Sequence, residues 1–297
     1  MTLEHGYENF IRDKMLRDLS DRTIEAYRDI IEPFIAYVGG SMEAEKLTTE
    51  NIKDYIAHLQ KRKLAKASLA TYIRHIKVFL NWLSEETSVS FQVHKIPMPR
   101  VPKKNVHVYS TDEVREIFAT IHATPEWIAL RNRAAIALML DSGLRRHEVC
   151  TAETAKLDTE AGLLTIIGKG EKERTVPIGR LSRRFISEYR SACPYDTSKT
   201  LLVGRYGEPF TDNALKQLVA KLAAKLPFEF SCHKLRHNFA TNFCLDMYEE
   251  KGHMDAYSLQ IILGHAEIQT TMRYIHHAQQ IVASRAHISH MDKLFGV

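Results

Sequence analysis

Apolar and polar positions alternate with helical period along the first ninety residues and predict three helices there. Ser20 is a suitable N-cap for the first, which ends at Gly39 and Gly40. Its apolar positions are Ile24, Tyr27, Ile31, Phe34, Ile35 and Val38. The second follows Thr48 and has one apolar face, formed by Ile52, Tyr55, Ile56 and Leu59. The third carries Leu69, Tyr72, Ile73, Ile76, Phe79, Leu80 and Leu83. We expect residues 1–90 to form a helical domain.

The helical period then stops, and residues 91–109 predict an extended, basic linker. Its prolines and basic residues are Lys95, Pro97, Pro99, Arg100, Pro102, Lys103 and Lys104. A second domain over residues 110–297 is expected to begin with a helix, because Ser110 and Glu113 have the spacing of a capping box ahead of an apolar run.

A β-hairpin is expected inside the second domain. Residues 163–167 are rich in β-formers, residues 168–173 have turn chemistry, and residues 174–178 resume the strand pattern. Lys169 would lie at the rim of this hairpin. The loop lacks the spacing of a nucleotide-binding phosphate loop, so no nucleotide cofactor is expected. The predicted fold class is therefore mainly α, with a small β-hairpin or sheet in the second domain.

Composition adds little about the partner but favours an ordinary two-domain protein. The chain has 297 residues, 44% of them hydrophobic, which is enough for two cores. Lys and Arg number 41 against 36 Asp and Glu, a net charge of +5 that only mildly favours polyanions. The scattered cysteines Cys150, Cys193, Cys232 and Cys244 indicate reduced thiols. With no apolar run of membrane-spanning length and no signal core, we expect a cytoplasmic protein without a membrane partner.

The candidate chemistry lies in the second half of the chain. His233 and Arg236 precede His265 and Tyr274, and Arg145 lies upstream. Planar guanidinium groups match the oxygens of a phosphodiester without a metal. A tyrosine hydroxyl, whose ordinary pKa is ~10, needs nearby cations or a base to act as a nucleophile. Lys169 could protonate the leaving sugar oxygen.

These motifs resemble those of the tyrosine recombinases of the phage-integrase family. The matching segments cover most of the second half: Ser142-Gly143-Leu144-Arg145 with Glu148, Gly168-Lys169-Gly170 with Lys172-Glu173-Arg174, His233-x-Leu-Arg236-His237, and Leu263-Gly264-His265 with Tyr274. The chain departs from the family at Arg146 and His147, which are more polar than usual, and in residues 246–253, which form a longer segment than usual.

The resemblance implies a role for each matched residue. Arg145 corresponds to the first catalytic arginine, with Glu148 as its acidic partner. Lys169 corresponds to the general acid, and Tyr274 to the nucleophile. The remaining catalytic positions are His233, Arg236 and His265.

The resemblance also implies an activity and an assembly. The expected reaction cleaves and rejoins DNA through a 3′-phosphotyrosyl link, without metal, ATP or other cofactor. Expected partners are double-stranded DNA sites and three further copies of the chain, forming a tetramer on two sites. The helical first domain would be a core-binding domain that forms a C-shaped clamp with the catalytic domain, with no arm-binding domain ahead of Leu19.

Two surface features are further candidates. Basic residues that could follow a phosphate backbone are Lys61, Arg62, Lys63, Lys66, Arg74, Lys77, Lys103 and Lys104. A solvated polar face is the ordinary alternative. An apolar stripe near the C-terminus, formed by Ile281, Ile288, Met291 and Phe295, predicts a helix that docks on a neighbouring protomer or folds back on its own domain.

Several alternatives stay open. The segment 289–294 favours integration and excision of a mobile element over Xer-type resolution of chromosome or plasmid dimers, and a catalytically inactive DNA-binding regulator is a third possibility. Taken alone, Arg145 could simply pair with Glu148, and Tyr274 could be a core residue. Four residues near one another in sequence, Cys232, His233, His237 and Cys244, could suggest zinc, but their spacing does not match a familiar site, and no metal is expected.

Overall fold

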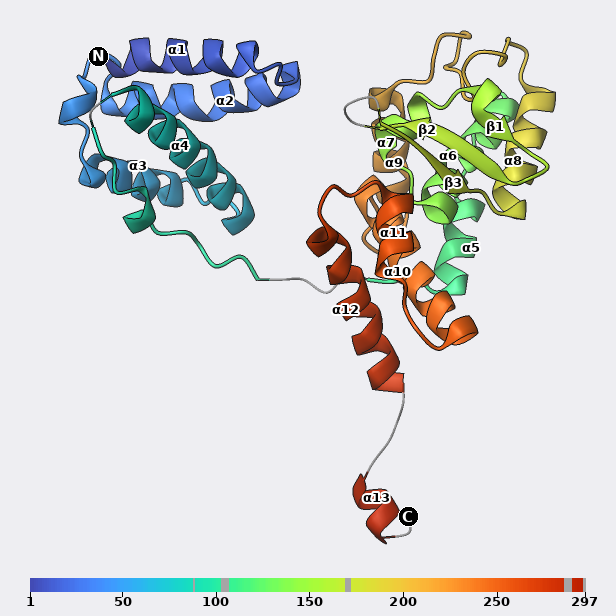
Figure 1. Cartoon of the computed structure of the whole chain (residues 1–297). Helices are drawn as coiled ribbons and strands as arrows, with labels where there is room; N and C mark the ends of the chain where they lie inside the picture. The colour runs from blue at the N-terminus through green and yellow to red at the C-terminus, as the bar shows by residue number, and fades with distance from the viewer. Residues whose placement is uncertain (88, 103–106, 169–171, 286–289, 296–297) are drawn as a thin grey trace. The chain divides into compact units, whose positions relative to one another are not determined.

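The computed structural model describes residues 1–87, 89–102, 107–168, 172–285 and 290–295, and the chain forms two compact units, Met1–Lys104 and Asn105–Val297 (Figure 1). Helices dominate both units, and the sheet among the described residues is small and antiparallel. The predicted fold class is confirmed. None of the described helices combines the length and apolar character that a membrane span requires.

The first unit is helical. It contains α1 (Leu3–Leu16), α2 (Asp21–Val38), α3 (Thr49–Lys61) and α4 (Lys66–Glu86), with short 3-10 turns at Ala44–Lys46 and Val93–Lys95. The three predicted helices are α2, α3 and α4, and α1 was not predicted. Thr48 caps α3 as expected, because its Oγ1 accepts the Asn51 amide at 3.2 Å. Phe10 of α1 lies in the core, where its ring contacts Tyr27, Phe79 and Trp82 edge-on.

The second unit surrounds one long buried helix. Its elements are α5 (Thr111–Ala119), α6 (Glu126–Ser142), α7 (Arg146–Cys150), a 3-10 turn (Thr154–Lys156), β1 (Leu157–Asp158), β2 (Leu163–Ile167), β3 (Glu173–Pro177), α8 (Arg180–Ala192), α9 (Asp212–Ala223), α10 (Cys232–Lys251), α11 (Ala256–Leu263), α12 (Ile268–Arg285) and α13 (His290–Phe295). The capping box of α5 is present, with Ser110 and Glu113 bonded as predicted. α6 packs against α8 on one side and α10 on another, so it is apolar on most of its circumference.

The predicted hairpin is confirmed as β2 and β3, and β1 extends it to a sheet in the order β1-β2-β3. Ile167, the last residue of β2, pairs with Glu173, the first residue of β3, and Leu163 pairs with Pro177 at the open end. Leu164, Ile166 and Val176 are buried, so the alternate positions of the hairpin anchor it to the domain core. Arg174 pairs with Ile166 and lies on the same inward face of β3 as Val176, beside the site described below.

Gly143 makes the connection from α6 to Arg145. It ends α6 in the left-handed conformation, with a φ of 61°. A Cβ atom there would lie 2.3 Å from the Phe239 ring and 3.0 Å from Leu263. Only glycine therefore permits α10 and α11 to approach this turn so closely.

α10, α11 and α12 form a separate hydrophobic cluster. The longer segment that follows Leu245 extends α10 to Lys251, and Gly252 caps the helix. Tyr274, Ile275 and Ala278 of α12 are buried in this cluster.

The C-terminal stripe is only partly as predicted. Ile281 belongs to α12 and packs against the hydrophobic cluster of its own unit, so placing it in a terminal docking helix was wrong. Its helical spacing from Ala278 and Ile275 explains this, because all three lie on the face of α12 that meets α10. Met291 and Phe295 are exposed on α13, and Ile288 lies outside the described residues.

Candidate active site

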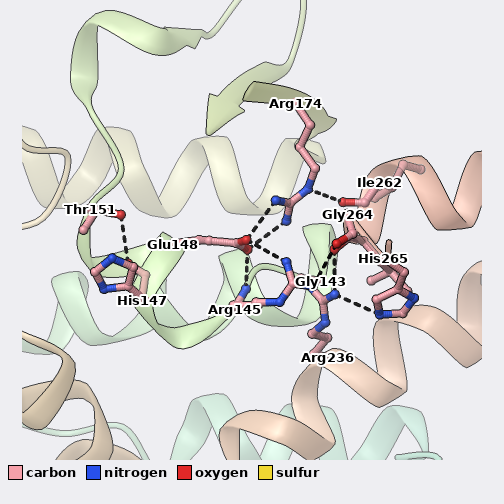
Figure 2. Close-up of polar contacts among 11 residues, drawn as sticks. Gly143, Arg145, His147, Glu148, Thr151, Arg174, Arg236, Ile262, Gly264 and His265 are labelled. Atoms are coloured by element: carbon pink, nitrogen blue, oxygen red, sulfur yellow. Dashed lines mark hydrogen bonds and ion pairs between the residues drawn. The ribbon is translucent and has the colours of Figure 1, made fainter. Parts of the chain in front are cut away.

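Two arginines bind the buried carboxylate of Glu148 from different elements. Arg174 of β3 donates Nη1 to Oε1 and Nη2 to Oε2, both at 2.8 Å. Arg145, just before α7, donates Nη1 to Oε1 at 2.9 Å and its amide to Oε2 at 2.7 Å (Figure 2). Burial alone would raise the pKa of Glu148, but the hydrogen bonds from Arg174 and Arg145 lower it to about 2. The carboxylate is therefore charged at neutral pH.

Three arginines also hold the C-terminal end of α11. Arg174 Nε donates to the Ile262 carbonyl at 2.8 Å, Arg236 Nη2 to the Leu263 carbonyl at 2.6 Å, and Arg145 Nη2 to the Gly264 carbonyl at 3.0 Å. The last carbonyls of a helix lack intrahelical donors, and cations are favourable beside them. We call Arg145, Glu148, Arg174 and Arg236 the arginine cluster.

Arg236 is the most buried guanidinium of the cluster, only 6% exposed. Its Nη1 donates to the Gly143 carbonyl at 2.6 Å, so Arg236 joins the end of α6 to the end of α11. Burial and the neighbouring Arg145 lower the pKa of Arg236 to about 10. Arg236 therefore stays a cation at neutral pH.

His265 follows the last residues of α11 and contacts Arg236. Its Nε2 lies 3.1 Å from Arg236 Nη2, and its Nδ1 lies 2.8 Å from Thr271 Oγ1 (Figure 2). A guanidinium can only donate, so Nε2 accepts from Arg236, the contact drawn in Figure 2, and Nδ1 carries the proton toward Thr271, which that figure does not label. Burial and the surrounding arginines, Arg236 first, lower the pKa of His265 to about 4. The imidazole is neutral and its tautomer is fixed.

Tyr274 of α12 is buried, with 3% of its surface exposed. Its ring stacks on His265 at 6.2 Å and lies 5.1 Å from the ring of His237. Its hydroxyl accepts a hydrogen bond from Arg273 Nη2 at 3.0 Å, and the Arg273 guanidinium lies 4.9 Å from the ring centroid. The arrangement places a cation directly on the predicted nucleophile.

His233 contacts the site through His237. The two Nε2 atoms are 2.5 Å apart, so one histidine donates and the other accepts. Burial, together with His233 and Arg273, lowers the pKa of His237 to about 3. Burial and Arg273 also lower the pKa of His233. Both histidines are neutral at neutral pH, and His237 Nδ1 has no hydrogen-bond partner among the described residues.

The structure brings most of the predicted catalytic residues into one region. Arg145, Arg236 and His265 share a hydrogen-bond network, and Tyr274 packs on His265. Lys169 falls between β2 and β3 in the sequence and lies outside the described residues.

Sequence reasoning missed three contributors, Arg174, Arg273 and Thr271. Arg174 stood within a quoted motif without an assigned role. Nothing in the residue pattern indicated the contact between Arg273 and Tyr274.

The candidate zinc residues form no metal site in the part of the chain that is described, where no group of three or more His, Cys, Asp or Glu side chains converges. The His233 and His237 nitrogens are 2.5 Å apart, which leaves no space for an ion between them. Cys232 and Cys244 are free thiols.

The candidate DNA-binding residues of the first unit have different environments. Lys61, Arg62, Lys63 and Lys66 are exposed at the turn between α3 and α4, and Arg74 is exposed on α4. Lys77 is partly buried and donates to the Ile96 carbonyl at 2.9 Å, so it serves the packing of its own unit. Lys103 and Lys104 lie outside the described residues.

Comparison with known proteins agrees with this geometry. The profile of the "Phage integrase family" matches residues 108–280, which contain the arginine cluster, His265 and Tyr274. The chain belongs to the phage integrase family. The profile "Phage integrase, N-terminal SAM-like domain" matches residues 7–90. The resemblance seen in the sequence is confirmed.

Individual relatives extend over nearly the whole chain. Tyrosine recombinase XerC of Xylella fastidiosa is 28% identical over 265 residues, 88% of this chain and 87% of the relative. The Tn1549 transposon integrase, solved with circular intermediate DNA, superposes with a TM-score of 0.75 at 16% identity over 92% of this chain and 95% of that one. A lambda integrase tetramer bound to a Holliday junction superposes with a TM-score of 0.73 at 15% identity, over 92% of this chain and 77% of that one. The chain is a tyrosine recombinase and hence a DNA strand-transferase enzyme, as predicted.

Proposed function

We propose that Tyr274 attacks a scissile DNA phosphate while Arg145 and Arg236 hold its non-bridging oxygens. The P–O bond to the tyrosine forms, the P–O bond to the 5′ oxygen breaks, and a 3′-phosphotyrosyl link stores the bond energy for rejoining. The observation that supports this most is the packing of Tyr274 on His265, which is itself bonded to Arg236. Fixed cations beside a developing phosphoryl charge supply most of the stabilisation, so no metal or nucleotide is needed.

The other residues have supporting roles in this proposal. Lys169, which falls between β2 and β3 in the sequence, protonates the departing 5′ oxygen. Glu148 orients Arg145, and neutral His265 holds Arg236 in place. His233 contacts the phosphate after its hydrogen bond to His237 breaks. Because Tyr274 is only 3% exposed, α12 must shift before the hydroxyl meets DNA.

A covalent-trapping experiment tests the reaction. The substrate is a pool of random-sequence duplexes that are nicked at varied positions, so that a short strand diffuses away after cleavage. Wild-type protein and Tyr274→Phe are each incubated with this pool. We expect detergent-resistant adducts with wild type only, since phenylalanine lacks the attacking oxygen. Sequencing the trapped DNA then identifies the site. Equal adducts from both proteins, or none from wild type, would contradict the proposal and favour a catalytically inactive DNA-binding regulator.

We further propose that residues 1–90 form the core-binding domain, joined by linker 91–109 to a catalytic domain over residues 110–297. The exposed basic residues at the α3–α4 turn support this, because Lys61, Arg62, Lys63 and Lys66 can all reach phosphates. Arg74 joins them on α4, whereas Lys77 acts mainly within its own unit. Since its substrate is cellular DNA, we also propose that the protein acts in the cytoplasm.

We propose that the protein acts as a homo-tetramer on two DNA sites, with α13 docking on the next protomer. Met291, Leu294 and Phe295 are 59%, 62% and 73% exposed, and large apolar side chains rarely stay in solvent together without a partner. The lambda integrase tetramer on a Holliday junction shares the fold and supports this stoichiometry.

Truncation after Arg285 tests the docking helix. This end point retains all of α12, including Ile281, which packs in its own domain. We expect single-site DNA binding within about twofold of wild type, since α13 is an exposed addition, but loss of the tetrameric complex on paired sites. Sedimentation with one and with two sites measures both. Normal tetramers from the truncated protein would place the interface elsewhere.

For the biological role we propose integration and excision of a mobile element. The structural similarity to the Tn1549 transposon integrase favours this role, and the sequence similarity to XerC over 88% of the chain favours dimer resolution as the second candidate. The trapped site decides between them. A site at the ends of an element that contains the gene supports integration, whereas a single chromosomal site remote from the gene supports dimer resolution.

A further inference from the structure

Arg174 uses all three of its guanidinium nitrogens within the arginine cluster. Nη1 and Nη2 grip the two oxygens of Glu148, and Nε holds the Ile262 carbonyl. Its side chain is only 10% exposed, compared with 41% for Arg145. Arg174 is therefore turned toward the protein, while Arg145 is the member of the pair that can meet a ligand.

We propose that Arg174 is a positioning residue that keeps the charge of Arg145 available for the scissile phosphate. This inference rests on the proposed function of Arg145. Arg174 acts through Glu148 and through the end of α11, and it does not touch the substrate.

Charge balance is the first part of the argument. Glu148 has one negative charge, which its pKa of about 2 preserves at neutral pH, and both Arg145 and Arg174 donate to its Oε1. With Arg174 present, one guanidinium neutralises the carboxylate and the other remains in excess. Without Arg174, Arg145 alone would compensate a buried carboxylate, and buried charges are costly to leave unpaired. Arg145 would then offer less positive charge to a phosphate.

Geometry is the second part. Arg174 Nε holds the Ile262 carbonyl while Arg145 Nη2 holds the carbonyl of Gly264, two residues on. The same strand-to-helix contact brings Arg174 Nη1 within 3.0 Å of where a Cβ on Gly264 would lie, and this glycine has a φ of 62°. Arg174 thus fixes the end of α11, whose Gly264 carbonyl accepts the hydrogen bond from Arg145. Loss of Arg174 would release both the carboxylate and the carbonyl that set the direction of Arg145.

The test compares variants on substrates that differ only at the reacting phosphate. Arg174→Gln and Arg174→Lys are measured beside Arg145→Gln, with Arg183→Gln as the matched control. Arg183 also donates to a backbone carbonyl, that of Thr159 at 2.7 Å, but lies outside the cluster. The substrate is the duplex trapped by the wild-type protein, made with the native phosphate, with a neutral methylphosphonate, or with sulfur as the 5′ bridging atom. Single-turnover cleavage and thermal unfolding are recorded for each protein.

On the native phosphate we expect Arg174→Gln to cleave about 100-fold slower than wild type, as for loss of a charge-stabilising donor. On the methylphosphonate, which has one negative charge fewer, the deficit should shrink at least about tenfold, as it does for Arg145→Gln. The cleavage rate of Arg174→Lys should lie between those of wild type and Arg174→Gln, because lysine keeps the positive charge but cannot bind both oxygens of Glu148 as a guanidinium does. Arg183→Gln should cleave all substrates like wild type.

Other outcomes overturn the inference. An equal deficit on phosphate and methylphosphonate would show that Arg174 only stabilises the fold. Rescue by bridging sulfur, which leaves without a proton, would show that Arg174 serves the proton donor and not Arg145. Wild-type activity of Arg174→Gln would show no role at all. If wild type itself forms no adduct, the proposed function fails and this inference fails with it, an outcome distinct from the three above.

Discussion

The arginine cluster keeps its charges although it is buried, whereas the neighbouring buried histidines are neutral. In the cluster, the pKa of Glu148 is about 2 and that of Arg236 about 10, so both stay charged at neutral pH. Among the aromatic groups, the pKa of His237 is about 3 and that of His265 about 4, so both stay neutral. We call His233, His237, His265 and Tyr274 the histidine–tyrosine face.

Partners explain the difference. Burial disfavours charge in both regions, but Glu148 receives guanidinium donors that reverse the effect, whereas nearby arginines lower the pKa of the histidines further. The cluster is thus a preformed anion site whose charges cannot be switched off near neutral pH. The histidines of the histidine–tyrosine face are held neutral by burial and by the surrounding positive charge. A bound phosphate would offset part of that positive charge. Binding of DNA at the cluster would therefore change the electrostatic environment of the histidines.

Removal of Arg236, which belongs to the cluster and contacts His265, should have the largest effect on cleavage. Arg236→Ala removes a charge and leaves the carbonyls of Gly143 and Leu263 without their donor. We expect single-turnover cleavage to fall about 1,000-fold, with further loss of stability from the unpaired buried carbonyls, about 1–3 kcal/mol each. Cleavage of the trapped duplex and thermal unfolding measure the two effects.

Arg236→Lys is the informative companion. It keeps a cation but cannot bridge two carbonyls and His265 at once. Cleavage near the wild-type rate in Arg236→Lys would show that charge alone matters and that the bridge between α6 and α11 does not.

Acid should weaken the histidine–tyrosine face before it weakens the cluster. The pKa of His237 is lowered from 6.5 to about 3, so below pH 6.5 the unfolded chain binds a proton that the folded chain does not. Stability is therefore full above pH 6.5 and falls as the pH decreases, by about 2 kcal/mol between pH 6.5 and 4.5 from this residue. Glu148 contributes only later, as the pH falls from 4.5 toward 2.

Denaturant titrations of wild type and His237→Gln across this range test the order. Between pH 6.5 and 4.5, the free energy of unfolding of the variant should depend less steeply on pH, by a slope that corresponds to about one proton. An unchanged slope would mean that His237 is protonated in the folded protein and that the face is not held neutral.

The helices predicted from sequence are those with long periodic faces. α2, α3 and α4 each place several apolar residues toward one core, and β2 and β3 alternate across a sheet. α1 was missed because its buried positions are few, namely Leu3, Gly6, Phe10 and Ile11. β1 contains two residues, too short for any period. The terminal stripe joined Ile281 to Met291 because periodicity does not show where one helix ends.

The site could be predicted only as a set of residue types in order. Arg145, His233, Arg236, His265 and Tyr274 were found because motifs mark them, and the structure places them together. Apart from the contact between Arg145 and Glu148, the contacts that organise them were not predictable. Arg174 meets Ile262, and Arg145 meets Gly264, across large separations in sequence that leave no local pattern. Shared tertiary contacts of this kind arise only when α7, β3 and α11 meet.

The smallest expected effect concerns Arg273, which extends the positive charge of the cluster to Tyr274. Its Nη2 donates to the tyrosine hydroxyl at 3.0 Å, yet the arginine itself is exposed. Arg273→Gln should therefore leave the fold intact and slow cleavage about tenfold, because one charged donor to the nucleophile is lost. Arg273→Lys should recover part of the rate, since an ammonium can donate to the same oxygen. Cleavage at saturating DNA isolates this step from binding. If the rate at saturation is unchanged and only affinity falls, Arg273 contacts DNA and Tyr274 is activated by another group.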